Sequence, residues 1–225
     1  MRGQKRHDLE LLRGQRHRAP LHAHLVFAEP HLQLFDIDRL REVALDQYGF
    51  VTTAQAEEAG VSAPSLAMLV KRGRLERVVR SVYRVPQVPP ASFDRFMLAL
   101  LWTGCDEAAL SHETALDAYD VCDVNPTSIH VVVDGGRRIR RKGGEGYAIH
   151  YETVDAKQVG WWEGMRCVKL ATAIEQCAAT GTPRYLLEQA VENGRKRGLL
   201  GKREAERFEA MVGGADEQEQ RGEPS

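Results

Sequence analysis

Six basic side chains crowd into one short stretch in the first half of the chain. Residues 71–84 carry five arginines and one lysine against the single acid Glu76. Cations at this density attract nucleic acid, because each phosphate contact releases condensed counterions. The net charge of the whole chain is only −1, so affinity for DNA has to come from such local charge. We therefore expect these side chains to contact the DNA backbone: Lys71, Arg72, Arg74, Arg77, Arg80 and Arg84.

The residues just before this stretch have the spacing of a helix-turn-helix. Such a motif needs a small residue where its helices cross, a turn residue that tolerates positive φ, and apolar anchors for the second helix. Ala56 and Gly60 meet the first two demands. The anchors follow at helical spacing: Val61, Leu66, Leu69 and Val70. We expect helices over residues 53–59 and 63–72.

The face of the second helix opposite these anchors is predicted to enter a DNA groove. Ser62 can cap this helix, and Pro64 in its first turn needs no intrahelical N–H partner. Helical periodicity places the following residues on this face: Ser62, Ala63, Pro64, Ala67, Met68 and Lys71. The preceding helix adds Thr53 to the predicted contact residues. No Arg, Asn or Gln lies on the second helix's face. The face is therefore poor in side chains that read bases by hydrogen bonding, although Ala63, Ala67 and Met68 could contact thymine methyl groups.

Further elements complete a predicted winged helix-turn-helix over residues 36–86. A first helix should begin at Asp36 as N-cap and end near Gly49, with an apolar stripe made by Ile37, Leu40, Val43 and Ala44. Strands are expected over residues 75–79 and 82–85, joined near Arg80 and Ser81 into a two-stranded wing. The alternative is that the same scaffold binds protein instead of DNA.

Prolines mark the boundary to a second domain, expected over residues 91–212. Pro86, Pro89 and Pro90 break the chain there. Beyond them the sequence predicts a helix capped by Ser92, strands at 128–133 and 146–154 around the turn signal Asp134-Gly135-Gly136, and two or three helices between Leu170 and Met211. The fold class is therefore α+β, with an N-terminal winged helix-turn-helix followed by a mixed α+β domain.

The ends of the chain and its composition limit the cellular setting. We expect residues 1–35 to be a basic, disordered arm, either a solvated tail or a source of extra phosphate contacts, and residues 213–225 to be a disordered tail. The longest apolar run, residues 97–102, is too short for a membrane span, and no signal peptide is visible. The four cysteines form no metal-binding or disulfide pattern. These features predict a cytoplasmic protein.

Two other groups of residues suggest chemistry that we consider less favoured. Asp134, Asp155 and Lys157 echo the carboxylate and lysine array of metal-dependent nucleases, although Asp134 is also explained by its turn. His112, His130 and His150 could form a three-histidine metal site, but their neighbours read as ordinary sheet alternation. The expectation is a protein without catalytic residues, metal or cofactor. Trp161-Trp162 is interpreted as a satellite of the core, with a recognition surface as the alternative.

A basic run in the second half offers a possible second contact with nucleic acid. Its charged members are Arg137, Arg138, Arg140, Arg141 and Lys142. Three interpretations stay open for this flexible loop: a solvated segment, a nucleic-acid contact, or a surface for a protein partner.

The stretch from Gly49 to Val85 resembles a known family. It reads G-F-V-T-T-A-Q-A-x-x-A-G-V-S and then L-V-K-R-G-R-L-E-R-V-V-R-S-V-Y-R-V, and it is similar to the N-terminal domain of AbiEi-type antitoxins of bacterial type IV toxin-antitoxin systems. The resemblance continues to about residue 200 in four further segments: 111–116, 126–133, 164–178 and 197–200.

That resemblance implies a regulator with two partners. The first domain is expected to bind inverted repeats of double-stranded DNA at its own promoter and repress transcription. The second is expected to counteract a nucleotidyltransferase toxin. Three positions depart from the family pattern: Ser81 replaces a glycine of the wing, and Thr172 and Gln176 stand where Arg and Asp are usual. The sequence does not define the operator or the oligomeric state.

Overall fold

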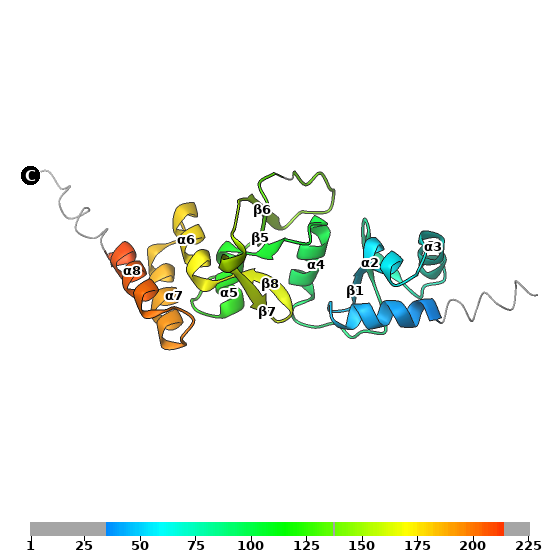
Figure 1. The fold of residues 1–225 in the computed structure, drawn as a ribbon, viewed down its shortest axis with the longest axis horizontal. Coiled ribbons are helices and arrows are strands. Elements are labelled where there is room, and N and C mark those ends of the chain that lie inside the picture. The colour runs from blue at the N-terminus through cyan, green and yellow to red at the C-terminus, as the bar shows by residue number, and fades with distance from the viewer. Residues whose placement is uncertain (1–34, 137, 214–225) are drawn as a thin grey trace, which may run out of the picture.

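The computed structural model describes residues 35–136 and 138–213. The predicted basic arm up to residue 34, Arg137 and the predicted tail from residue 214 lie outside these ranges. The described chain is a mixed α+β structure with two separate sheets (Figure 1). None of its helices is both long and apolar enough to cross a membrane.

The N-terminal unit is a small antiparallel sheet covered by helices. A helix over residues 35–45 precedes β1 (Phe50–Thr52), α2 (Thr53–Glu58), α3 (Ala63–Lys71), β2 (Glu76–Val79) and β3 (Val82–Arg84). The strand order is β1-β3-β2, and β1 is an element that the sequence did not predict. Its core contains three of the four predicted anchors, and the fourth, Val70, is half-buried against it. The buried residues are Ile37, Leu40, Ala44, Val51, Ala56, Val61, Leu66, Leu69, Leu75, Val85 and Val88.

Local hydrogen bonds explain where α2 and α3 begin. Thr52 and Gln55 form a capping box at the start of α2, and the Ser62 hydroxyl accepts the Ser65 N–H at the start of α3. Gly60 between the helices has φ +81, the conformation for which glycine was predicted. Asp36 was expected to be an N-cap, but it lies inside the first helix and is nearly buried. That helix also ends at residue 45, ahead of the turn at Gly49.

The second unit is built on a five-stranded sheet of order β6-β5-β4-β8-β7. Its strands are β4 (Ala109–Leu110), β5 (Ile129–Val133), β6 (Tyr147–Tyr151), β7 (Val159–Trp162) and β8 (Met165–Val168). The sequence placed β5 and β6 around a tight-turn signal, but the two strands pair in parallel, with Ile129 opposite Tyr147. Parallel neighbours cannot be joined by a tight turn, so the chain makes a long crossover that contains the basic run.

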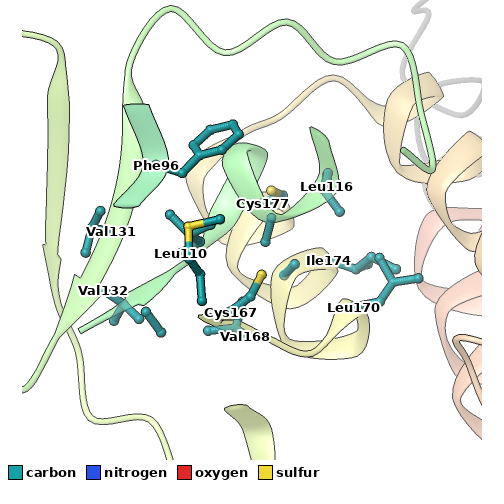
Figure 2. Packing of buried hydrophobic residues seen from close by; sticks show 14 of the residues in the cluster. Phe96, Leu110, Leu116, Val131, Val132, Cys167, Val168, Leu170, Ile174 and Cys177 are labelled. Carbon is teal, nitrogen blue, oxygen red and sulfur yellow. The ribbon is translucent and has the colours of Figure 1, made fainter. Parts of the chain in front are cut away.

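Helices pack on this sheet and on one another, and α7 and α8 extend the molecule away from the first unit (Figure 1). They are α4 (Asp94–Thr103), α5 (His112–Tyr119), the 3₁₀ turn η1 (Ala156–Gln158), α6 (Leu170–Thr180), α7 (Arg184–Lys196) and α8 (Lys202–Gly213). Figure 2 shows side chains of β4, β5 and β8 meeting those of α5 and α6 in one core. Ser92 is not the cap of α4, because Phe93 occupies that position and makes no side-chain cap.

Helix α4 lies between the two sheets and contacts both of them. It packs on β4 and β5 of the large sheet and on β1 and β3 of the small one. Phe50 and Val82 of the small sheet belong to the same apolar cluster as Phe96 and Leu110. The two units are therefore joined by a continuous apolar contact.

Ser81, at the tip of the β2–β3 hairpin, has φ +65, which is unfavourable for a residue with a side chain. Replacing it with glycine should raise the free energy of unfolding by about 0.5–1 kcal/mol, because relief of the left-handed strain exceeds the added chain entropy. Urea unfolding of Ser81→Gly measures this difference. Arg80→Gly is the control, since Arg80 is outside the positive-φ set, and it should destabilise. A fall in stability for both variants contradicts the assignment of strain to Ser81.

Candidate nucleic-acid interface

The exposed face of α3 carries the residues that the sequence assigned to it. Ser62, Ala63, Pro64, Ala67 and Lys71 are exposed, whereas Leu66 and Leu69 are buried. Met68 is partly exposed and is not part of the core cluster around the anchors. Thr53 is half-buried, and its N–H donates to the carbonyl of Ser81 at 3.0 Å, which ties the start of α2 to the hairpin tip.

Three arginines of the β2–β3 hairpin region point to solvent. Arg74, Arg77 and Arg80 are exposed, as is Arg72 at the end of α3. Leu75, just before β2, is buried in the core, whereas Glu76 and Arg77 at the start of β2 are both exposed. The hairpin therefore presents its charge on the surface.

Arg84 has a different environment from the other arginines of this stretch. Its side chain is only 16% exposed, and its Nη1 donates to Asp94 Oδ2 of α4 at 2.8 Å. Its guanidinium also lies over the Phe50 ring, 5.1 Å from the centroid, and Nη2 reaches the Val88 carbonyl at 3.4 Å. This residue was predicted to contact DNA, and the structure places it in contacts within the protein.

The basic run of the β5–β6 crossover is held at several points. The Ile139 N–H donates to the Tyr151 hydroxyl at 3.2 Å, and the Arg138 guanidinium lies over the Tyr151 ring. At the other side, Arg141 Nη1 donates to the Trp102 carbonyl at 2.9 Å, and Trp102 Nε1 donates to the Lys142 carbonyl at 3.0 Å. The sequence suggested a flexible loop, but aromatic side chains that it did not single out anchor this segment.

The hairpin tip and the basic run line one hollow of about 360 Å³. Its wall contains Arg80 and Ser81 from the hairpin and the end of α4 around Gly104. The remaining wall comes from the crossover: Arg138, Ile139, Arg140 and Arg141. Among the described residues, no acidic side chain lines this hollow, so the two basic segments form one positively charged surface.

The residues of the nuclease alternative are engaged in local structure. Asp134 Oδ1 accepts the Gly136 N–H within its own turn, and Asp155 forms a capping box with Gln158 at the start of η1. Asp155 and Lys157 do not line the hollow that contains Asp134. Of the two tryptophans, Trp162 packs on Phe93 and Phe96, whereas Trp161 is 72% exposed.

The three histidines converge, contrary to the interpretation favoured from sequence. His112 stacks on His150 with centroids 3.5 Å apart, and His130 Nδ1 lies 3.0 Å from His150 Nε2. Burial lowers the pKa of His112 to about 3. Burial also lowers the pKa of His130 and of His150, so all three imidazoles are neutral near pH 7. Within the described ranges, these three histidines have ring nitrogens close enough together to hold one metal ion.

Comparison with known families bears on the N-terminal unit. Residues 38–86 match the family described as "Transcriptional regulator, AbiEi antitoxin". This segment of the first unit is therefore similar to AbiEi antitoxins. This confirms the resemblance drawn from Gly49 to Val85, and the match ends at residue 86, where the prolines begin. The AbiEi-like segments suggested beyond that residue stay predictions.

A crystal structure of the RV2827C protein from Mycobacterium tuberculosis is similar over 76% of this chain and 69% of that chain, with 16% sequence identity and a TM-score of 0.48. A search of curated proteins found no match.

Loss of the Arg84–Asp94 contact should destabilise the protein. Arg84→Ala is expected to lower the free energy of unfolding by about 1.5–3 kcal/mol, because a half-buried, charge-assisted hydrogen bond is lost. Arg77→Ala, on the exposed side of the hairpin, should change it by less than about 0.5 kcal/mol. A double-mutant cycle with Asp94→Ala isolates the coupling between the two side chains. Equal effects of the Arg77 and Arg84 variants contradict this difference in environment.

The two faces of α3 should respond differently to truncation. Leu66→Ala is expected to cost about 2–5 kcal/mol, because a buried side chain leaves a cavity. Met68→Ala should cost less than about 1 kcal/mol, since Met68 lies outside the core cluster. Urea unfolding of both variants makes the comparison. A Met68 variant as unstable as the Leu66 variant means that α3 presents a different face to solvent.

Proposed function

We propose that this chain is a DNA-binding transcriptional repressor of the AbiEi type. Residues 36–86 act as a winged helix-turn-helix, in which α2 and α3 form the helix pair and the β2–β3 hairpin is the wing. Residues 91–212 act as the regulatory domain. The AbiEi match supports a regulatory antitoxin role, and the exposed arginines supply the charge that DNA binding needs.

The observation that carries this proposal is the shared basic hollow between the hairpin tip and the crossover. Arg80 and Arg140 come from parts of the chain that are far apart in sequence, yet they line the same depression. A DNA duplex whose phosphate backbone contacts the wing would therefore also contact the second unit. We infer that the crossover is a second DNA contact rather than a solvated loop.

The remaining features of the proposal follow from the AbiEi resemblance. The repressor binds an inverted repeat near its own promoter, and the second unit counteracts a nucleotidyltransferase toxin. These partners place the protein in the cytoplasm. The groove face of α3 has no Arg, Asn or Gln to read bases by paired hydrogen bonds, so we expect phosphate contacts to dominate the affinity.

Salt-dependent DNA binding tests the arrangement. The full chain is titrated into a duplex from the region upstream of its own gene and into a random duplex of equal length. Arg74→Ala, Arg77→Ala and Arg140→Ala should each weaken binding to both duplexes by the same factor. Each lost phosphate contact should reduce the slope of log Kobs against log salt by about 0.9.

Arg203→Ala is the matched control, because it removes the same charge from the exposed surface of α8, at the far end of the molecule (Figure 1). Its affinity and salt slope should equal those of the parent. Equal losses in the Arg203 and Arg77 variants mean that the hairpin is not the contact. A parent protein that binds neither duplex overturns the repressor in favour of a protein-binding module.

A further inference from the structure

Three elements of the second unit bring one histidine each to the same point. His112 is the first residue of α5, His130 lies on β5, and His150 lies on β6. One ring nitrogen from each residue falls within 4.8 Å of the other two. Because β5 and β6 pair in parallel with Val132 opposite His150, His130 and His150 share one face of the sheet. None of the three histidines lines the basic hollow.

The backbone at His112 adopts an unfavourable conformation to reach this position. Its φ is +50, and the side chain is fully buried. Non-glycine residues with a positive φ carry strain, and such strain is concentrated at ligand-binding positions. The surrounding structure holds the residue there through the His112 N–H, which donates to Gln176 Oε1 at 3.3 Å.

His112 Nε2 faces the Glu152 carboxylate. His112 Nδ1 lies 3.1 Å from the Ser111 hydroxyl, whereas the buried Nε2 has no hydrogen-bond partner in the described chain. Glu152 Oε1 lies 3.5 Å from that Nε2. If the single proton of the neutral ring is on Nδ1, the Nε2 lone pair points toward a carboxylate oxygen. A cation between these two atoms converts an unfavourable contact into a bound ligand pair.

The spacing of the other two rings is close to that of a metal site. His130 Nδ1 and His150 Nε2 are 3.0 Å apart. Tetrahedral zinc with bonds of about 2.0–2.1 Å places its nitrogen ligands roughly 3.3–3.4 Å apart, so only a small opening is required. The stacked rings of His112 and His150, inclined by 18°, must tilt so that their lone pairs converge. Binding thus requires side-chain rotation and no movement of the sheet.

Neighbouring side chains orient the cluster in the way that outer partners orient metal ligands. Glu152 Oε2 accepts a hydrogen bond from Gln176 Nε2 at 2.8 Å. The backbone N–H of His130 donates to Thr114 Oγ1 at 2.8 Å, which fixes the strand against α5. These contacts hold the Glu152 carboxylate and the His130 backbone in place, as outer partners hold metal ligands.

We propose that His112, His130 and His150 bind one divalent transition metal ion, Zn²⁺ in particular, with the Glu152 carboxylate as fourth ligand. Neutral imidazoles and a carboxylate are ligands that zinc accepts. Four protein ligands leave no open position, so the ion is structural. It links α5, β5 and β6 and stabilises the second unit.

The test measures metal binding by the full chain after its other histidines are removed. Those five residues, which would compete for the ion, are changed to Asn: His7, His17, His22, His24 and His31. Zn²⁺ titrated into this parent should bind at one ion per chain and raise the melting temperature. Co²⁺ in its place should give the visible absorption of a tetrahedral site. Absence of binding, or binding without a change in melting temperature, overturns the proposal.

Single substitutions then assign the ligands. His130→Asn and His150→Asn should weaken zinc binding by more than the roughly 10–100-fold typical of an outer partner. Glu152→Gln should also weaken it and change the cobalt spectrum. Glu113→Gln is the matched control, because this carboxylate is next to His112 in sequence but accepts a hydrogen bond from Thr182 Oγ1. Equal affinity in all these variants overturns the assignment.

X-ray absorption at the zinc edge of the parent needs no variant and covers the case in which a histidine variant does not fold. Three nitrogens and one oxygen at about 2.0–2.2 Å support the site. A shell made of sulfur or of water oxygens alone overturns it.

Discussion

The guanidinium of Arg84 is the contact on which the arrangement of the two units depends. It is shared among the Asp94 carboxylate, the Val88 carbonyl and the Phe50 ring. Arg84 ends β3, the central strand of the small sheet, and Asp94 begins α4. The ion pair therefore fixes the base of the hairpin to the helix that supports the large sheet. Phe50 and Val82 reinforce this contact by entering the apolar core of the second unit.

Helix α4 has oppositely charged partners at its two ends. Asp94 occupies its first turn, where the helix dipole favours an acid, and Arg141 donates to the Trp102 carbonyl near its last turn, where the dipole favours a cation. One end thereby holds the hairpin, and the other holds the crossover. Gly104, with φ +64, ends the helix where a side chain would overlap the Arg141 guanidinium. Because α4 contacts the hairpin at one end and the crossover at the other, both basic segments border the same hollow.

Local elements were predictable from the sequence because their signals are local. The capping box at Thr52, the cap at Ser62 and the glycine turn at Gly60 are each set by residues a few positions away. The contacts of Arg84 were not predictable, since Arg84 and Arg77 lie in the same basic stretch and the packing of Arg84 against α4 is visible only in the fold. β1 was also missed, because three residues are too few to show a period and only β3 pairs with them.

The histidine cluster depends on register that the sequence does not reveal. An antiparallel hairpin and a parallel pair place different residues beside His130. The turn signal at Asp134 favoured the hairpin, but β5 and β6 pair in parallel. The contributions of Glu152 and Gln176 depend in turn on where α6 packs. One local signal was available, since Glu152 follows His150 by two residues, and such residues share a face of a strand.

The parallel pairing of β5 and β6 also has a consequence for how this protein can change. A parallel pair always needs a crossover, so the sheet requires a segment here whatever the segment does. The entropy of closing such a loop rises slowly, by about 0.6 kcal/mol for each doubling of length. Residues can thus be inserted beyond the points anchored by Tyr151 and Trp102 with little loss of stability. The length and charge of the β5–β6 crossover can therefore change during evolution without altering the core.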